Sequence, residues 1–343
     1  MSRHPGSLLA DTDMTKDRLA GLISLATELK RDKRGGTERA RLTGRTIALL
    51  FEKNSTRTRC AFEVAAYDQG GHTTFLGPTG SHVGVEESIP DTARVLGGMY
   101  DGIAFRGFAQ ETVEQLADQS GVPVWNALTD IWHPSQPLAD FQTMTEHHTG
   151  AVEEISFCYA GDGRNNVARS LLVSGAILGM DVRIAAPKAL QPPPEVQSAA
   201  ESAAAGSGAR ILVTDDMTAA VDGVDFLYTD VWLSMGEPDE RWASRVDELL
   251  PYRVTAEVMA STGKATTKFM HCLPSLHNRQ TTVGARLYNQ FGLDGAEVTE
   301  EVFESPNSIV FDQSENKMHS IKALIVSALG KDWAKTEPGL GQD

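Results

Sequence analysis

Residues Ser55, Thr56, Arg57, Thr58 and Arg59 stand in a row and combine three hydroxyl groups with two guanidinium groups. Guanidinium forks match the oxygens of a phosphate, and hydroxyl groups add short hydrogen-bond donors. At about 1.5–3 kcal/mol for each hydrogen bond to a charged group, a few such contacts would hold a phosphate at micromolar affinity. The string predicts a phosphate site, but by itself it is equally typical of a capped helix with two surface arginines.

A strand-to-helix junction is expected to position this string. The apolar run Thr46–Phe51 before it predicts a buried strand, and Ala61–Ala66 after it predicts a helix. At such a junction Ser55 or Thr56 can cap the helix, and the first-turn amides, which have no partner inside the helix, point outward. The helix start therefore adds to the attraction for an anion.

Strand and helix patterns alternate along most of the chain. In the first half a leading helix is predicted at 13–30, strands at 46–51, 72–76, 102–106 and 123–127, and helices at 57–69, 88–99, 109–119 and 137–148. In the second half strands are predicted within 154–161 and at 181–186, 209–214, 224–229 and 267–272, and a last amphipathic helix at 317–330. This alternation is typical of crossover units that build a parallel sheet covered on both faces.

We therefore predict an α/β fold with two doubly wound parallel-sheet domains, an active site in the interdomain cleft, and terminal helices linking the two. The length of 343 residues suits two domains. The first is expected at 1–148 and the second at 149–316, while 317–343 are expected to form a C-terminal helix that packs back on the first domain, and a tail. The residues Met99, Met180 and Met270 are interpreted as core.

Polar clusters follow several of the predicted strands. They are Arg106, His133–Gln136, Gly161–Asn166, Asp230–Gly236 and His271–Pro274. Ligands of open parallel sheets gather at the carboxyl ends of the strands, so we expect these clusters to form an active site. A dinucleotide site is disfavoured, because Gly161–Asn166 lacks both the G-x-G-x-x-G pattern and an acidic residue about 20 positions further on.

The charge balance and the cysteines limit the partners and the compartment. The chain carries 31 Lys and Arg against 46 Asp and Glu, a net charge of −15, which makes nucleic acid and anionic membranes poor partners. Cys60, Cys158 and Cys272 are odd in number and widely spaced, as is typical of reduced thiols, and none has a metal-ligand spacing. With no signal peptide pattern and no run of 18 apolar residues, we expect a cytoplasmic protein.

Taken together, these motifs resemble the ornithine branch of the aspartate/ornithine carbamoyltransferase family, and the resemblance covers nearly the whole chain. Ser55–Arg59 is similar to the family's phosphate loop, His133–Gln136 to its H-P-x-Q motif and His271–Pro274 to its H-C-L-P motif. Asp230–Gly236 is similar to the D-x-x-x-S-M-G loop that marks the ornithine branch.

The resemblance implies transfer of the carbamoyl group from carbamoyl phosphate to the δ-amine of L-ornithine, giving L-citrulline and phosphate in arginine metabolism, with no cofactor or metal. The first domain would bind carbamoyl phosphate, through Ser55, Thr56, Arg57, Thr58, Arg59, His82, Arg106, His133, Gln136, Cys272, Leu273 and Lys317. The second domain would bind ornithine, through Asn166, Asp230, Ser234 and Met235. Arg106, His133, Asp230 and Cys272 would take part in catalysis. The family assembles as trimers or multiples of trimers, so we expect a homo-oligomer in which His82 reaches a neighbouring subunit's site.

Two positions depart from the family pattern. His82 stands where many relatives have Gln. Lys317 stands where the family has an Arg that is expected to touch the carbamoyl oxygen. Because Lys keeps the charge but loses the planar fork, we predict weaker carbamoyl phosphate binding or an adjusted pose.

Carbamoyl transfer passes through a tetrahedral centre whose oxygen becomes negative. Arg106, His133 and the hydroxyl of Thr58 are donors of the kind that this charge needs. The attacking amine must be neutral, which costs about 4–5 kcal/mol at pH 7 if its pKa is about 10.4. Asp230 would aid binding but favours the ammonium form. We therefore expect closure of the Ser234–Gly236 loop to lower the pKa of the amine, and the bound phosphate to accept its proton.

Two alternatives are left open by the residues. A carbamoyltransferase for aspartate would be expected to carry a Lys within Ser81–Ser88, where there is none, and one for putrescine would lack the Ser-Met-Gly loop. A catalytically silent relative kept for binding or assembly is the alternative from another class, and Lys317 is the one residue that favours it. The residues leave the direction of the reaction in the cell open, and citrulline synthesis is taken as the default because ornithine plus carbamoyl phosphate is the downhill direction.

Overall fold

The chain forms two compact units in the computed structural model. The residues that the structure describes are 3–79, 86–233 and 237–330. Unit 1 consists of Met1–Gln142 with Glu315–Asp343, and unit 2 of Thr143–Ser314. The chain passes into unit 2 within the helix α5 (Ser135–Glu146) and returns to unit 1 within the helix α13 (Val310–Leu329).

Unit 1 contains a four-stranded parallel sheet with the order β2-β1-β3-β4. Its strands are β1 (Thr46–Phe51), β2 (His72–Leu76), β3 (Gly102–Arg106) and β4 (Val124–Leu128). After β2 the chain crosses β1 and continues on its other side, so the direction of winding reverses between β1 and β3. Ligands of such sheets bind outside the carboxyl ends of the strands at this switch point.

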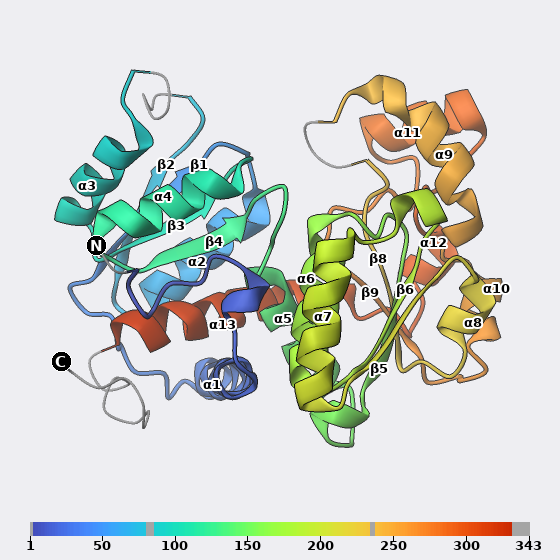
Figure 1. Cartoon of the computed structure of the whole chain (residues 1–343), viewed down its shortest axis with the longest axis horizontal. Helices are drawn as coiled ribbons and strands as arrows, with labels where there is room; N and C mark the ends of the chain where they lie inside the picture. Colours follow the sequence, from blue (N-terminus) through green and yellow to red (C-terminus); the bar gives the residue numbers. More distant parts are fainter. Residues whose placement is uncertain (1–2, 80–85, 234–236, 331–343) are drawn as a thin grey trace. The chain divides into compact units, whose positions relative to one another are not determined.

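Helices cover both faces of the unit 1 sheet (Figure 1). They are α1 (Lys16–Gly35), α2 (Thr56–Asp68), α3 (Ile89–Met99), α4 (Gln110–Ser120) and parts of α5 and α13. The helix α2 lies on one face, and α3 with α4 on the other, where Leu50, Phe105 and Leu116 are buried together (Figure 1). On the α2 face, Asp68 accepts hydrogen bonds from Lys33 of α1 and from the fully buried Lys322 of α13.

Unit 2 contains a five-stranded parallel sheet with the order β7-β6-β5-β8-β9, and its switch point lies between β5 and β8. The strands are β5 (Ser156–Ala160), β6 (Asp181–Ala185), β7 (Arg210–Thr214), β8 (Phe226–Thr229) and β9 (Lys268–His271). The helices are α6 (Asn166–Leu178), α7 (Pro194–Ser207), α8 (Met217–Val221), α9 (Trp242–Leu249), α10 (Ala256–Ser261), α11 (Thr282–Phe291) and α12 (Glu300–Phe303). Short 3-10 helices occur at Asp11–Asp13, Val152–Glu154, Lys188–Leu190, Asp239–Arg241 and Leu250–Tyr252. Leu227 and Phe269, both fully buried, belong to the core of this sheet.

The predicted fold class, two parallel-sheet α/β domains, is confirmed, while several details differ from the prediction. The unit boundaries fall at Gln142 and Ser314 rather than at 148 and 316. The last helix begins at Val310 rather than at 317. The first turns of this helix carry the polar residue Gln313, which is fully buried and donates to the Tyr228 hydroxyl at 3.1 Å. A polar residue in the core interrupts the apolar spacing by which the start of an amphipathic helix is predicted.

The interpretation of Met99 as a core residue is wrong, because its side chain is 70% exposed, whereas Met180 and Met270 are fully buried. Met99 ends α3, and the end of a surface helix can turn its last side chain outward. The polar tail 331–343 lies outside the described residues.

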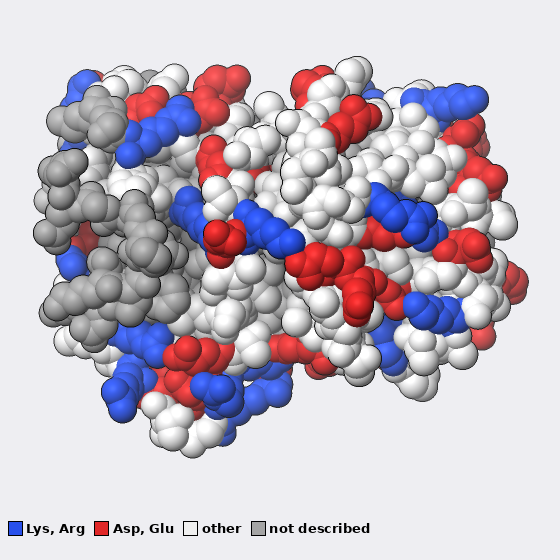
Figure 2. Space-filling model, turned by 60° about the horizontal axis from the view of Figure 1, so that its bottom comes forward, with Lys and Arg blue, Asp and Glu red and all other residues white. Residues whose placement is uncertain are grey.

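The surface carries both signs of charge. Figure 2 shows Asp and Glu side chains interspersed with Lys and Arg over the described residues of one face. Over the described ranges, every helix is too short or too polar to span a bilayer.

Candidate active site

The β1–α2 junction of unit 1 forms as predicted. Ser55 is the N-cap of α2, and its hydroxyl oxygen accepts a hydrogen bond from the Thr58 N–H at 3.2 Å. Arg57, half-buried in the first turn, forms no ion pair with any residue that the structure describes. The Arg59 guanidinium instead donates to Glu63 at 2.9 Å and lies 4.0 Å from the centre of the Phe75 ring. The helix start therefore offers an anion the unpaired cation of Arg57 and its first-turn amides.

Arg106 lies beside this junction because β1 and β3 are neighbours at the switch point. Phe51 and Arg106 are partners in the parallel register, and the Glu52 N–H donates to the Arg106 carbonyl at 2.8 Å. The side chain of Arg106 is buried, with only 4% exposed. The sheet thus places a second arginine next to the expected phosphate loop.

The segment after β4 adds a buried histidine and a buried glutamine. His133 is 3% exposed and Gln136 is 1% exposed. Lys317 of α13 donates to the Gln136 side-chain oxygen at 2.5 Å, and its Nζ lies 3.3 Å from Nε2 of His133. Burial, followed by the charges of Lys317 and Arg106, holds the pKa of His133 well below its usual range. His133 is therefore a neutral ring with two cations around it, an environment suited to a negatively charged oxygen.

In unit 2 the loop after β5 and the segment after β8 are joined by one buried arginine. Asn165 caps α6 by accepting the Val167 N–H at 2.7 Å, which leaves Asn166 in the first turn. Arg245, 5% exposed, pairs with Asp162 at 3.2 Å and with Glu237 at 3.1 Å. This arginine therefore ties the loop after β5 to the segment around Glu237.

Asp230 follows β8 and Cys272 follows β9, so neighbouring strands bring them together. The Cys272 thiol donates to Oδ1 of Asp230 at 3.2 Å, and the Val231 N–H donates to the same oxygen at 2.8 Å. Asp230 is 6% exposed, and burial raises its pKa. A buried carboxylate beside a thiol is suited to receive an ammonium or amine group of a ligand.

The turn after β9 has a strained backbone. Leu273 has φ of +59°, the one positive value at a non-glycine position among the described residues. Its N–H donates to Nδ1 of His271 at 2.9 Å. Strain of this kind persists where the surroundings hold it and is concentrated at functional sites.

Two groups of side chains are of types that bind metal ions, with ligand atoms within 4.8 Å of one another. The first is Asp230, His271 and Cys272, but both ring nitrogens of His271 already contact protein groups. The second is His277, Glu300 and Glu304, in which His277 pairs with Glu300 and stacks 3.6 Å from the Phe303 ring centre. Existing contacts within the protein account for both histidines.

Within each unit, the predicted residues gather at the carboxyl edge of the sheet. In unit 1 these are Ser55, Thr56, Arg57, Thr58, Arg106, His133 and Gln136, with Lys317 joined to them from α13. In unit 2 they are Asn166, Asp230, Cys272 and Leu273. His82, Ser234 and Met235 lie outside the described residues.

Sequence reasoning missed three residues of these networks. They are Asp140, which accepts from Gln136 at 2.8 Å, Arg245, and Glu297, which contacts His271 at 3.2 Å. Each is a charged residue in a segment without a motif, and its burial depends on distant partners. A signal in the sequence was available for Asp140 alone. It follows Gln136 by four positions on α5, the spacing at which two side chains of a helix can contact each other.

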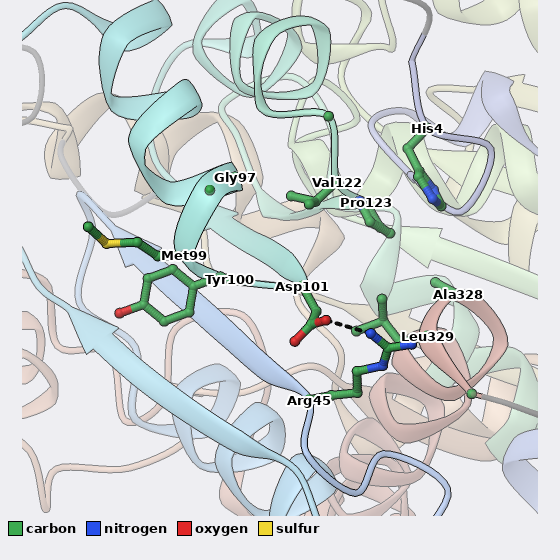
Figure 3. A pocket seen from close by; sticks show the side chains of 13 residues that line it. His4, Arg45, Gly97, Met99, Tyr100, Asp101, Val122, Pro123, Ala328 and Leu329 are labelled. Carbon is green, nitrogen blue, oxygen red and sulfur yellow. Dashed lines mark hydrogen bonds and ion pairs between the residues drawn. The ribbon is translucent and has the colours of Figure 1, made fainter.

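A hollow of about 760 Å³ opens at the opposite edge of the unit 1 sheet (Figure 3). Arg45, Asp101 and Pro123 line it, and each directly precedes a strand. The Arg45 guanidinium donates to Asp101 at 2.6 Å, and Figure 3 marks this contact. None of the residues predicted to bind a substrate lines this hollow, which lies at the amino ends of the strands.

Two family models match the chain, one in each half. The model described as aspartate/ornithine carbamoyltransferase, carbamoyl-P binding domain, matches residues 7–146. The model described as aspartate/ornithine carbamoyltransferase, Asp/Orn binding domain, matches residues 153–328.

Curated proteins and solved structures agree with these models. The chain is 55% identical over 324 residues to the ornithine carbamoyltransferase of Actinobacillus pleuropneumoniae serotype 5b, covering 94% of this chain and 97% of that protein. It is 55% identical over 328 residues to the catabolic ornithine carbamoyltransferase of Pseudomonas putida, covering 95% and 98%. The solved ornithine carbamoyltransferase from Pyrococcus furiosus superposes with a TM-score of 0.87 at 37% identity, covering 96% and 99%.

Proposed function

The chain belongs to the aspartate/ornithine carbamoyltransferase family, and on this premise we propose that it transfers the carbamoyl group of carbamoyl phosphate to the δ-amine of L-ornithine. The products are L-citrulline and phosphate, in arginine metabolism. The observation that carries the choice of ornithine is the buried carboxylate of Asp230. Ornithine brings two ammonium groups that this carboxylate attracts, whereas aspartate would bring a second carboxylate that it repels.

Carbamoyl phosphate is held by unit 1 in this proposal. Ser55, Thr56, Arg57 and Thr58 hold the phosphate, and Arg59 reaches it after leaving Glu63. Arg106, His133, Gln136 and Lys317 surround the carbamoyl group. Arg57, which forms no ion pair with a described residue, and the buried cations Arg106 and Lys317 support this assignment, because all three side chains can donate hydrogen bonds to an anion.

Ornithine is held by unit 2, through Asn166, Asp230, Ser234 and Met235, with Cys272 and Leu273 at the reacting end. The neutral δ-amine attacks the carbamoyl carbon, and the carbonyl oxygen becomes negative in the tetrahedral centre. The bond from that carbon to the phosphate oxygen then breaks, and the leaving phosphate accepts the proton that the amine loses.

Citrulline formation tests this function. Purified protein is mixed with carbamoyl phosphate and ornithine, aspartate or putrescine, and the carbamoylated product is identified by mass spectrometry. We expect citrulline from ornithine and little product from the other two amines. Product from aspartate or putrescine would assign a different amine, and the absence of any product would favour a catalytically silent relative.

The proposal extends to the assembly and the compartment. We assign a homotrimer or a multiple of trimers, with His82 from a neighbouring subunit near the carbamoyl phosphate. Cys60, Cys158 and Cys272 form no disulfide within the part of the chain that the structure describes, which supports the cytoplasm. Light scattering tests the assembly, and a monomeric mass would contradict it.

A further inference from the structure

We propose that Thr129 and Gln110 are positioning residues for His133, which they hold through the backbone of the turn that leads into it. The inference rests on the proposed function, because it assumes that His133 lies against the carbamoyl group. It deepens that function by naming two residues that act without touching the substrate. Both are buried in unit 1, and neither belongs to the motifs described above.

The turn before His133 is closed by Thr129, the residue that follows β4. The Thr129 N–H donates to the Trp132 carbonyl at 2.9 Å, and the Trp132 N–H donates to Oγ1 of Thr129 at 3.1 Å. Trp132 directly precedes His133, and its carbonyl belongs to the planar peptide unit that joins the two residues. The position of the His133 backbone therefore depends on the position of Thr129.

The side chain of Thr129 is held in turn by Gln110, the first residue of α4. Oγ1 of Thr129 lies 2.8 Å from Oε1 of Gln110, and these residues are 0% and 6% exposed. An amide oxygen carries no proton, so at this distance the hydroxyl group must donate. The same hydroxyl oxygen accepts the Trp132 N–H, because a backbone N–H can only donate. One hydroxyl group thus joins the turn to α4.

A backbone carbonyl decides which end of the Gln110 amide faces Thr129. Nε2 of Gln110 and Nδ2 of Asn126 lie 3.2 Å and 2.8 Å from the carbonyl oxygen of Leu9. A carbonyl oxygen only accepts, so both amides present their nitrogen to it, and the oxygen of Gln110 is left for Thr129. Leu9 is held in place because Leu8 pairs with β4, where its carbonyl accepts the Asn126 N–H at 2.8 Å.

The effect of this network on the reaction is geometric. Thr129, Gln110 and Asn126 are uncharged, so they add nothing to the field that the cations beside His133 provide. Their hydrogen bonds place a backbone segment, and a misplacement of about 1 Å in an active site can lower a rate by about 10²-fold. Loss of the Thr129 hydroxyl group removes the link between the turn and α4, together with the acceptor of the Trp132 N–H.

The hydroxyl group is tested by two substitutions of one residue. Thr129→Val keeps the shape of the side chain without the hydroxyl group, whereas Thr129→Ser keeps the hydroxyl group. The kcat/KM for carbamoyl phosphate is measured at saturating ornithine. We expect Thr129→Val to lower it by about tenfold or more and Thr129→Ser by less than about twofold. An equal loss in both variants would overturn the inference, because the packing of the methyl group would then be the cause.

A double-mutant cycle shows whether Thr129 acts through His133. Thr129→Val is combined with His133→Ala, and kcat/KM for carbamoyl phosphate is measured for the single and double variants. In the His133→Ala chain we expect Thr129→Val to lower kcat/KM by less than about twofold, because residues that act through one another are not additive. The same loss in both backgrounds would overturn the inference, because Thr129 would then act on another part of the site.

Thr262 of unit 2 provides the matched control. It is 1% exposed, and its hydroxyl group donates to the Met259 carbonyl at 2.8 Å and accepts the Lys264 N–H at 3.3 Å. Thr262→Val therefore removes a hydroxyl group from a similar buried turn. We expect kcat/KM for carbamoyl phosphate to change by less than about twofold, because independent sites do not couple. A loss as large as that of Thr129→Val would assign the effect to destabilisation and overturn the inference.

Gln110→Met keeps the inference testable if Thr129→Val does not fold. The variant replaces the amide by a weak acceptor, while the Thr129 hydroxyl group can still accept the Trp132 N–H. We expect kcat/KM for carbamoyl phosphate to fall by at least about twofold, the value of a buried hydrogen bond, and an unchanged value would overturn the inference. The two proposals fail separately: a native protein that forms no citrulline contradicts the proposed function, whereas citrulline formation with an additive cycle contradicts only the positioning of His133.

Discussion

His271 and Glu297 are both fully buried, and Nε2 of the imidazole lies 3.2 Å from Oε1 of the carboxylate. Nδ1 of the same ring accepts the Leu273 N–H, so the ring proton is on Nε2 and is donated to Glu297. Oε1 also accepts the Leu276 N–H at 2.7 Å. The pair therefore anchors both sides of the strained turn that follows β9.

Glu297→Gln should destabilise unit 2. Oε2 of Glu297 is buried and has no hydrogen-bond partner among the described residues, so the new amide would bury unpaired N–H groups there or lose an acceptor at Oε1. We expect the free energy of unfolding to fall by about 1–3 kcal/mol in urea denaturation. Glu300→Gln, at a half-exposed carboxylate that pairs with His277, is the control and should cost less than about 1 kcal/mol. Equal losses would contradict the role of the buried pair.

Asp230→Asn should weaken ornithine binding selectively. The variant keeps the shape of the side chain but removes the charge that attracts an ammonium group. We expect the KM for ornithine to rise by about 10–100-fold, the value of a hydrogen bond to a charged group, while the KM for carbamoyl phosphate changes by less than about twofold. Steady-state kinetics with each substrate varied in turn measures both. The control is Asp239→Asn, at an exposed carboxylate paired with Arg286, and it should change neither. A shared rise in both KM values would argue against the assignment of Asp230.

Ser55→Ala should cost both stability and carbamoyl phosphate affinity. Loss of the cap of α2 should lower the free energy of unfolding by about 1 kcal/mol, and loss of a hydroxyl donor should raise the KM for carbamoyl phosphate by about tenfold. Thr15 is the matched control, since its hydroxyl caps α1 by accepting the Arg18 N–H at the same distance of 3.2 Å. Thr15→Ala should show the loss of stability alone. If both variants raise the KM for carbamoyl phosphate equally, the rise comes from the loss of a helix cap, and Ser55 makes no separate contact with the phosphate.

The free energy of unfolding should fall as the pH is lowered through the range of histidine titration. Burial, followed by the charge of Lys322, lowers the pKa of His319 to about 4, and the pKa of His133 is also lowered. In the unfolded chain both groups return to their ordinary value of 6.5. Below pH 6.5 the unfolded chain therefore binds protons that the folded chain does not, and stability present above pH 6.5 is lost toward pH 4. Urea denaturation at a series of pH values measures this decline.

His319→Gln provides the comparison for that series. Glutamine does not titrate, so the variant should show a shallower decline between pH 6.5 and 4 than the native chain. A native curve that is flat across this range would contradict the lowered pKa values of the two histidines.

Local patterns in the sequence were sufficient for the fold class and for most positions of the candidate site. The apolar run Thr46–Phe51 forms β1 as predicted, and Ser55 caps α2, because strand burial and helix capping depend on a few adjacent residues. The carboxyl ends of parallel strands lie at one edge of the sheet. A polar residue that ends a predicted strand, such as Arg106, is therefore predicted to lie at that edge from its position in the strand. The same logic predicted the positions of Asp230 and Cys272 within unit 2.

Only the tertiary structure decided how these residues are paired and oriented. Lys317 meets His133 across 184 positions, and Glu297 meets His271 across 26, with no periodic pattern to relate them. The start of α13 was not predicted because Gln313, a polar residue, is buried there with a hydrogen-bond partner in the core. The contacts of Arg59 with Glu63 and Phe75 likewise could not be predicted from the sequence. The physical reason is that a buried polar group takes whichever partner the packing brings within hydrogen-bond distance, and that partner sets the proton position and pKa of the group.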